Sequence, residues 1–239
     1  TATFQLFYND SKMKYMFGLN AVFGLSAAYL NSYVNGEVVK IALDDVNSED
    51  VGFLGAISVS VASIGCILFG FLDKKIGKGL ILTIGAVAFI SMHIPFLVYP
   101  QVKSWGWSLL VLIYSLHGIG RATFEGTLRA TFADFFPQEK EGAFANIIFQ
   151  NGLASVIGYV LPYILTCTKI TNFCVKYSNG GLHNVLSFEI IVMSSGILAI
   201  LGYWRAYALF QREHSHYLMQ EDALQTEETT LLDKTSTKY

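Results

Sequence analysis

The chain has 239 residues, of which 53% are hydrophobic and only 14% are charged. Globular domains carry about 25% charged residues, so this composition does not provide an ordinary water-facing surface. The many aromatic residues exclude a disordered chain, and the net charge of -2 argues against a nucleic-acid binder. Three cysteines are too few for a disulfide-based scaffold. The composition therefore indicates a membrane protein.

Six apolar stretches are long enough to cross about 30 Å of hydrocarbon, which takes roughly 20 residues of helix. They lie at about 13–35, 51–72, 80–99, 105–136, 143–166 and 186–210. The strands of a membrane β-barrel would alternate apolar and polar residues, whereas these stretches are apolar on all sides. The sequence predicts an all-α membrane protein with a lead-in at 1–12, a six-helix domain at 13–210 and a disordered acidic tail at 211–239.

The distribution of positive charge predicts the orientation in the membrane. One side of the predicted helices collects most of the cations, namely Lys12, Lys14, Lys74, Lys75, Lys78, Arg129, Lys140, Arg205 and Arg212. The other side carries an acidic loop at 44–50. Because cytoplasmic loops are enriched in Lys and Arg, we expect both ends of the chain to be cytoplasmic.

The link between the second and third stretches reads Gly70-Phe-Leu-Asp-Lys-Lys-Ile-Gly-Lys78. It resembles the G-x-L-x-D-R-x-G-R pattern that the major facilitator superfamily places between the second and third helix of each six-helix half. The matching positions are Gly70, Leu72, Lys75, Gly77 and Lys78, whereas Lys74 occupies the acidic position and Asp73 lies one residue early. Glycines here permit a tight turn and the cations face the inner leaflet. A generic positive-inside turn is the alternative interpretation.

A second motif lies at the start of the fifth stretch. The sequence Glu141-Gly-Ala-Phe-Ala-Asn146, with Phe144 at its centre, follows a Gly-rich fourth stretch and an acidic link. This arrangement resembles the unc-ninety-three-like branch of the superfamily, which also tends to carry an asparagine at the position of Asn20. Arg121 departs from that resemblance, because a small acidic residue is expected there.

The resemblance implies a fold of 12 helices in two six-helix halves. The chain starts at Thr1 without Met, so we expect a processed chain or a fragment, and the resemblance makes it the C-terminal half. Its partners would then be the lipid bilayer and the N-terminal six-helix half. The superfamily implies transport of a small polar solute by alternating access. The branch implies instead a non-transporting regulatory or trafficking subunit of an ion channel or receptor.

One row of ionisable residues crosses the fourth stretch. His117, Arg121, Glu125 and Arg129 recur every four residues, so that neighbours in the row can meet on a helix. With entry near Trp107, His117 lies near the bilayer midplane, because ten residues rise roughly 15 Å. Ionisable groups at this depth usually face a bundle interior or a watery cavity. The row is either a cavity lining that meets a polar or anionic substrate, or an ion-pair ladder at a cytoplasmic gate.

Other polar residues within the stretches have two interpretations. Asn20, Asn146 and Gln150 can either line a solute path or bond between helices. Glu189 lies near the outer boundary, where we expect a carboxylate that reaches water. His93 lies two residues before Pro95, and we expect a kink at this point.

Two features outside the predicted helices bear on location. Cys167 and Cys174 share an outer loop, where they either form a disulfide or remain unpaired. In the tail, Glu227, Leu231 and Leu232 resemble an acidic dileucine sorting signal, which clathrin adaptors read, although such short patterns also arise by chance. These features favour a plasma membrane or an endosomal or lysosomal membrane.

The sequence lacks the common catalytic and nucleotide-binding motifs. A P-loop, a zincin helix and a nucleophile elbow are all missing, and Gly118 and Gly120 are expected to serve close helix packing. We therefore expect a protein that is not an enzyme, with no cofactor, no metal site and no nucleic-acid partner.

Overall fold

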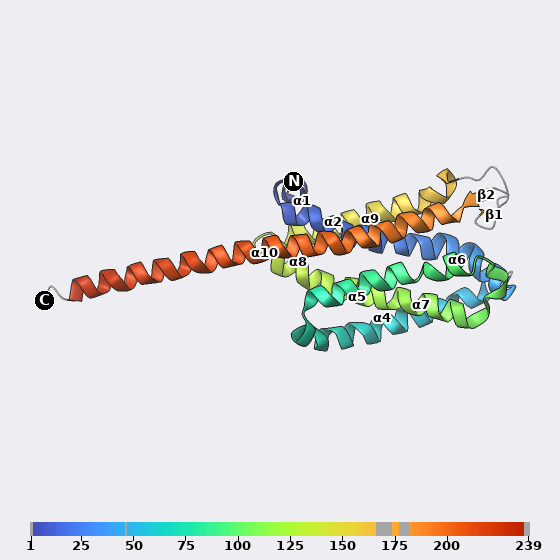
Figure 1. Cartoon of the computed structure of the whole chain (residues 1–239), viewed down its shortest axis with the longest axis horizontal. Coiled ribbons are helices and arrows are strands. Elements are labelled where there is room, and N and C mark those ends of the chain that lie inside the picture. Colours follow the sequence, from blue (N-terminus) through green and yellow to red (C-terminus); the bar gives the residue numbers. More distant parts are fainter. Residues whose placement is uncertain (1, 46, 166–173, 177–181, 237–239) are drawn as a thin grey trace.

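The computed structural model describes residues 2–45, 47–165, 174–176 and 182–236. Helices form an elongated bundle, and the last helix extends far beyond it (Figure 1). Among the described residues, the strands are β1 (Cys174–Lys176) and β2 (Leu182–Asn184), which pair antiparallel with Cys174 opposite Asn184. The prediction of a mainly helical chain is confirmed.

The first predicted stretch lies within one continuous helical rod that contains a π-helical section. A short helix, α1 (Ala2–Asn9), precedes α2 (Ser11–Tyr29), whose first turn is capped by Asp10 Oδ1 accepting from Lys12 N at 2.7 Å. The rod continues through a π-helical section, η1 (Leu30–Val38), into α3 (Val39–Leu43). It stops at Asp44, whose φ of 57° is left-handed.

The second and third stretches form a helical hairpin. Asp45 caps α4 (Glu49–Ile76) by accepting from the backbone N–H groups of Glu49 and Asp50 at 3.1 and 2.9 Å. Gly77, with a φ of 80°, separates α4 from α5 (Lys78–Ser91), a conformation that glycine adopts without steric cost.

His93 marks a break between α5 and α6 (Ile94–Val98), as predicted. Pro95 lies in the first turn of α6 and has no N–H to donate to the carbonyl of Ser91, the last residue of α5. The kink therefore follows from the missing hydrogen bond.

The remaining stretches contain a second π-helical section. A 3₁₀ turn, η2 (Val102–Ser104), leads into α7 (Gly106–Ala122), the π-helical η3 (Thr123–Leu128) and α8 (Arg129–Phe135). They are followed by α9 (Lys140–Ile164) and α10 (Val185–Ser236). The residues that line the candidate site come largely from these segments and from the first rod.

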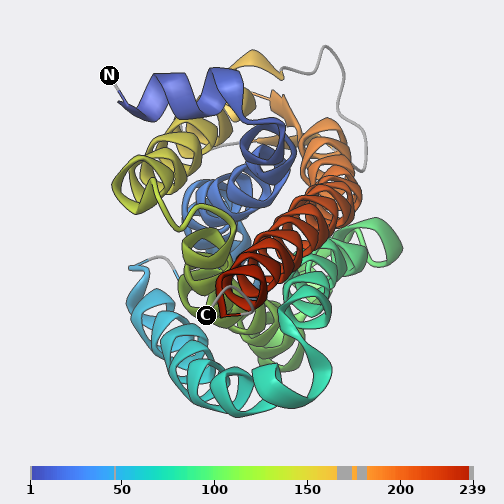
Figure 2. The ribbon, with the colours of Figure 1, turned by 90° about the vertical axis from the view of Figure 1, so that its left-hand side faces the viewer.

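Two sets of packed helices make up the bundle. In one, α2 lies between α9 and α10; in the other, α7 and η3 pack against α4 and α5 (Figure 2). Small residues permit close crossings in the second set. A Cβ added to Gly118 would lie 2.6 Å from the Ser58 carbonyl oxygen, and one added to Gly120 would lie 2.6 Å from the Phe89 ring. The expected packing role of these two glycines agrees with the structure.

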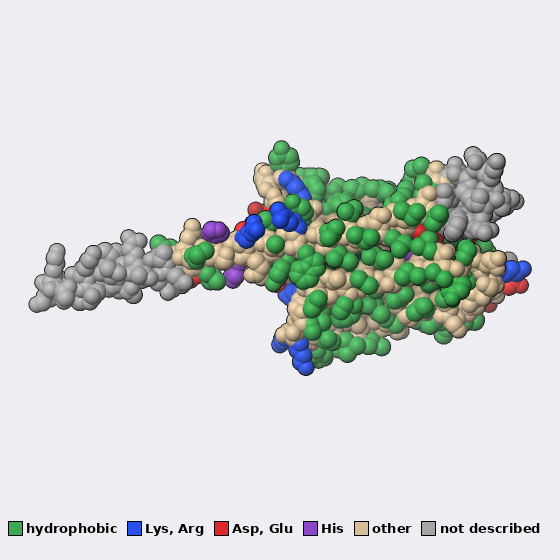
Figure 3. Space-filling view, viewed as in Figure 1, with side chains coloured by type: hydrophobic (Ala, Val, Ile, Leu, Met, Phe, Trp, Pro, Cys, Tyr) green, Lys and Arg blue, Asp and Glu red, His purple; other side chains and the backbone are tan. Residues whose placement is uncertain are grey.

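Four helices are long and apolar enough to cross a membrane. They are Glu49–Ile76, Lys78–Val98, Lys140–Pro162 and Leu186–Glu221. Apolar side chains cover much of the bundle surface, and Lys and Arg gather at the end from which α10 extends (Figure 3). Since soluble proteins rarely expose such large apolar surfaces, the chain is a multi-pass membrane protein. The other two predicted spans coincide with the rods that contain η1 and η3, and six spans remain a prediction.

The C-terminal segment differs from the disordered tail predicted after residue 210. Helix α10 continues to Ser236, and the side chains from Gln211 to Glu221 are all exposed. The charged and polar residues of this segment make good helix formers, and the helix grows from a turn already fixed in the bundle. The exposed side chains from Gln211 to Glu221 agree with the predicted lack of a packed core, whereas the helical backbone differs from the predicted disorder.

Candidate functional site

The predicted ionisable row is partly assembled. His117 is buried on α7, with its Nδ1 atom 2.9 Å from Ser58 Oγ on α4. One turn later, Arg121 Nε donates to Glu125 Oε1 at 2.7 Å. These two side chains keep 37% and 35% of their surface exposed, so the ion pair is accessible from a hollow rather than enclosed in the core.

Arg129 does not extend this ion pair. It is exposed, and the salt bridges of the described residues do not include it. The reason is η3, which lies between Arg121 and Arg129 and has more residues per turn than an α-helix. Residues four apart across η3 therefore do not lie above one another as they do in α7. The predicted row assumed α-helical spacing throughout, and for this reason it is wrong for Arg129.

Two hollows meet at Phe23 and Glu125, which line both of them. The first hollow, of about 350 Å³, is also lined by His117, Arg121 and residues of η1. The other, of about 280 Å³, lies between η3 and α9 and includes Arg129. Together they form one groove along α2, which we call the α2 groove. Glu125 lies at its centre.

The polar lining of the α2 groove continues onto the first rod. Tyr114 OH donates to Asn35 Oδ1, and Asn35 Nδ2 donates to Asn31 Oδ1 at 3.2 Å. Both asparagines belong to η1, so each π-helical section supplies side chains to the same groove. Single π turns inside helices often occur at functional sites. The sequence analysis missed Tyr114 and Asn35, because their contact joins residues far apart in the chain.

The predicted amides connect helices instead of lining the groove. Asn20 Nδ2 donates to Gln150 Oε1 at 2.7 Å, and Gln150 Nε2 lies 3.5 Å from Asn146 Oδ1. Asn146 Nδ2 in turn donates to the carbonyl oxygens of Thr3 and Gly142, both at 2.9 Å. All three amide side chains are buried, and neither hollow of the groove includes them. Of the two interpretations, interhelical bonding agrees with these contacts.

A second buried polar cluster was missed by sequence reasoning. Glu189 on α10 is only 2% exposed and accepts from Tyr29 OH at 3.0 Å. The His93 ring centre lies 4.4 Å from that of Tyr29, and both buried His93 nitrogens have no hydrogen-bond partner among the described residues. The expectation that Glu189 reaches water is wrong, because α2 and Phe188 enclose the start of α10. The signal available in the sequence was a carboxylate within an apolar stretch.

The loop that resembles the superfamily pattern forms a tight turn. Gly70, Leu72 and Asp73 belong to the last turns of α4, and the Asp73 carbonyl accepts from Gly77 N at 2.9 Å. Lys75 is exposed, whereas Lys78 Nζ donates to Asp134 Oδ2 at 2.6 Å. This ion pair ties the start of α5 to the end of α8. The acidic partner thus comes from another helix and not from the loop itself.

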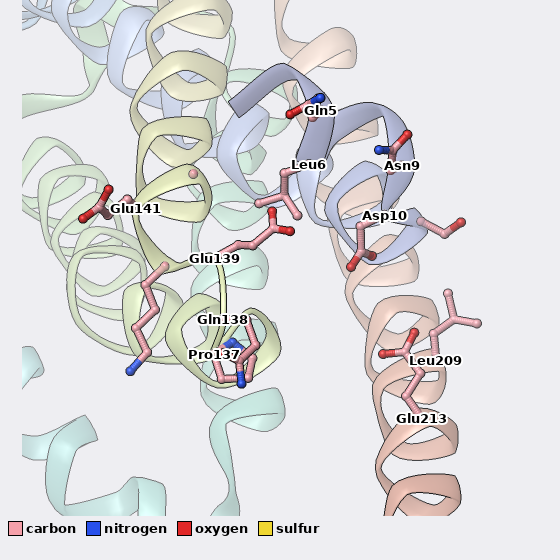
Figure 4. A pocket seen from close by; sticks show the side chains of 13 residues that line it. Gln5, Leu6, Asn9, Asp10, Pro137, Gln138, Glu139, Glu141, Leu209 and Glu213 are labelled. Carbon is pink, nitrogen blue, oxygen red and sulfur yellow. The ribbon is translucent and has the colours of Figure 1, made fainter. Parts of the chain in front are cut away.

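The second motif forms the start of α9, where Glu141 and Phe144 lie at the surface and Asn146 is buried. Nearby, a polar recess of about 1040 Å³ lies between α1, the α8–α9 connection and α10 (Figure 4). Lys12 forms ion pairs with Asp10, at 3.5 Å, and with Glu213 of α10. These contacts fasten α2 to α10 at the Lys-rich end.

Two sequence predictions fall outside what the structure describes in side-chain detail. Cys167 lies outside the described residues, and the side chain of Cys174 is not described, so their pairing remains a prediction. Glu227, Leu231 and Leu232 lie within the backbone of α10, and their side chains are likewise not described. Among the described residues, no three or more His, Cys, Asp or Glu side chains are grouped to hold a metal ion.

Comparison with known proteins gives one distant similarity. The chain is 23% identical over 158 residues to human Protein unc-93 homolog A. The aligned region includes 66% of this chain but only 34% of the human protein, so the chain spans about a third of that relative. No family model and no solved structure matches the sequence. The similarity agrees with the predicted branch, and it supports a multi-pass membrane protein.

Proposed function

We propose that the chain is the C-terminal six-helix half of a major-facilitator-type carrier that moves a small polar solute by alternating access. The observation that carries the proposal is the half-exposed ion pair of Arg121 and Glu125 at the centre of the α2 groove. Charged groups at membrane depth are costly, and they persist where they face a watery path. The N-terminal half would close the open side of the groove.

The proposed roles follow from the contacts of each side chain. Arg121 offers guanidinium donors to an anionic or carbonyl group, and Glu125 offers oxygens to a donor group of the solute. Asn31 and Asn35 add neutral hydrogen-bonding groups at the η1 side. His117 is fixed through Nδ1 by Ser58, and its Nε2 atom is buried without a partner. We assign it a positioning role at the edge of the groove.

The test is uptake by the purified full-length protein in liposomes, after small polar solutes have been screened for thermal stabilisation. Arg121→Gln and Glu125→Gln should each reduce uptake at least tenfold, while Arg205→Gln serves as a matched control that changes an exposed cation outside the α2 groove. If Arg121→Gln transports like the wild type, with equal insertion into the liposomes, the proposal is wrong. Equal losses in all three variants would indicate a nonspecific effect of removing a charge instead.

The second candidate function is a regulatory or trafficking subunit of a channel or receptor. The similarity to unc-93 homolog A and the resemblance of the fifth stretch to that branch favour it. In this case the α2 groove would receive a partner helix, and Arg121 and Glu125 would be a structural pair. Affinity purification of the tagged protein from membranes would then recover a channel or receptor stoichiometrically, and liposomes would show no solute uptake. If the Phe23→Ala variant no longer co-purified with that partner, the partner would be inferred to bind in the α2 groove.

The membrane in which the protein functions is also part of the proposal. We assign the Lys-rich end, where α1 lies and from which α10 extends, to the cytoplasm of a plasma, endosomal or lysosomal membrane. Both chain ends of this segment would then be cytoplasmic, as adaptor recognition of Leu231 and Leu232 requires. Leu231→Ala with Leu232→Ala should shift the steady-state location of the tagged protein. An unchanged distribution would remove the sorting signal from the proposal.

A further inference from the structure

A second hollow on α2 faces away from the α2 groove. It has a volume of about 420 Å³, and its floor is formed by residues of α2, among them Lys14, Gly18, Ala21 and Leu25. Helices α9 and α10 form the two walls: each packs along α2, but they scarcely touch each other (Figure 2). We call this hollow the α2 crevice. The walls, α9 and α10, both belong to the helices that are long and apolar enough to cross a membrane.

Small residues explain why the α2 crevice is open. An added Cβ at Gly18 would lie 3.0 Å from the Ala199 backbone, so α10 approaches α2 closely there. On the other side, a Cβ at Gly158 would lie 2.6 Å from Ala28 Cβ, so α9 also approaches α2 closely. Both walls therefore sit tight against α2, while Ala21 on the floor and Ser195 on the α10 wall leave the space between them unfilled.

The depth of the α2 crevice corresponds to one leaflet of a bilayer. From Lys14 to Leu25 the helix advances 11 residues, or about 16 Å at 1.5 Å per residue. Half of the hydrocarbon core measures about 15 Å. The crevice thus begins at the Lys-rich end of the bundle and ends near the bilayer midplane. An acyl chain of a phospholipid in that leaflet has the matching length and direction.

The mouth of the α2 crevice carries a cation that is available for a headgroup. Lys14 is exposed, and its Nζ atom lies 5.5 Å from the centre of the Tyr8 ring. The neighbouring Lys12 is occupied by Asp10 and Glu213, whereas the ion pairs among the described residues do not include Lys14. Below the mouth the lining is almost wholly apolar, apart from the Ser195 hydroxyl, which donates to the Val192 carbonyl oxygen at 2.6 Å.

We propose that the α2 crevice binds one anionic phospholipid of the Lys-rich leaflet, with an acyl chain between α9 and α10 and the headgroup at Lys14. The crevice is long, has apolar walls and carries a cation at one end. These features match the apolar tail and the anionic headgroup of a phospholipid. Packing of the chain against the apolar walls supplies affinity, because the chain leaves other lipid tails and not water when it enters the crevice. The charge supplies the preference among headgroups. This inference is independent of whether the α2 groove transports a solute.

The experiment places the protein in nanodiscs of phosphatidylcholine with a minor fraction of phosphatidylserine and counts the retained lipids by native mass spectrometry after gentle delipidation. Wild type should retain one phosphatidylserine. Ser195→Leu, which fills the crevice from α10, should lose it, whereas Ser194→Leu is the matched control, because this neighbouring serine is exposed outside the crevice. Ala21→Leu fills the floor and provides a second, independent test.

Lys14→Gln should leave the crevice open and lower the preference for phosphatidylserine over phosphatidylcholine about fivefold, as expected for one lysine at a membrane surface. Lys75→Gln, a change at an exposed lysine of the same end, should leave the preference unaltered. Retention of the lipid in both Ser195→Leu and Ala21→Leu would overturn the proposal. An unchanged preference in Lys14→Gln would also overturn it.

Discussion

The crossing of α4 and α7 is a close packing contact beside the α2 groove, and Gly118→Val tests it. The first carbon added at Gly118 would lie 2.6 Å from the Ser58 carbonyl oxygen and 2.8 Å from Val61 Cβ. Both distances are far below van der Waals contact, and the first involves backbone that cannot rotate away. Overpacking of this kind costs typically about 1–3 kcal/mol, while the gain in helix propensity over glycine is only a few tenths of a kcal/mol. We expect a net destabilisation of about 1–3 kcal/mol.

The assay is reversible unfolding of the purified protein in mixed micelles, with Gly70→Val as the matched control on α4. At Gly70 an added Cβ meets nothing within 4 Å, so that variant should unfold within about 0.5 kcal/mol of wild type. Because the clash separates the carbonyl of Ser58 from α7, the contact of Ser58 with His117 should be lost too. Uptake should therefore fall even under conditions in which the variant remains folded. Equal stability of the two valine variants would refute the close crossing and the placement of His117 that depends on it.

Three further changes separate the functions of polar contacts. Asn20→Ala removes an interhelical hydrogen bond and should cost about 0.6 kcal/mol in micelle unfolding while leaving uptake unaltered. Tyr29→Phe removes the donor to the buried Glu189 carboxyl group and should destabilise by about 1–3 kcal/mol in the same assay. Lys78→Ala breaks a partly exposed ion pair with Asp134 and should cost less than about 1 kcal/mol, a difference that disappears at high salt.

Each of these predictions has its own control. If Asn20→Ala lost uptake while keeping the stability of the wild type, the interpretation that Asn20 lines the solute path would be favoured instead. Tyr159→Phe, at an exposed tyrosine, should be neutral, and a Tyr29→Phe variant as stable as Tyr159→Phe would contradict the burial of Glu189. For Lys78, a loss that persists in high salt would show that the side chain contributes by packing rather than by charge.

Sequence reasoning succeeded wherever the determining interaction is local. Stretches of apolar residues predict helices because each residue bonds to its own helix, and Pro95 predicts the break at His93 because the missing N–H is its own. The turn at Gly77 likewise depends on one residue with a positive φ. The pairing of Arg121 with Glu125 follows from a separation of four residues, which places them on neighbouring turns where α7 meets η3. None of these required knowledge of the neighbouring helices.

The failures share a different origin. Glu189 is buried because α2 packs against α10, and its donor Tyr29 lies 160 positions away, so no local pattern records that contact. Arg129 leaves the row because η3 changes the number of residues per turn. The helical state of the segment after residue 210 was missed because low apolar content predicts an absence of packing, whereas a helix anchored at one end needs no new nucleus.

Helix α2 lines the α2 groove with one face and the α2 crevice with the opposite face, and this arrangement connects the two proposals physically. At about 100° per residue, Phe23 and Ala27 point toward the α2 groove, while Gly18, Ala21 and Leu25 lie roughly 180° away in the α2 crevice. Any tilt or rotation of α2 that changes the width of the groove must therefore also change the width of the crevice. Because packed helices shift between discrete arrangements and do not deform continuously, a chain held in the crevice stabilises one position of α2. Filling the crevice with Ser195→Leu should then alter the rate of uptake through the groove without touching its lining, and Ser194→Leu should not.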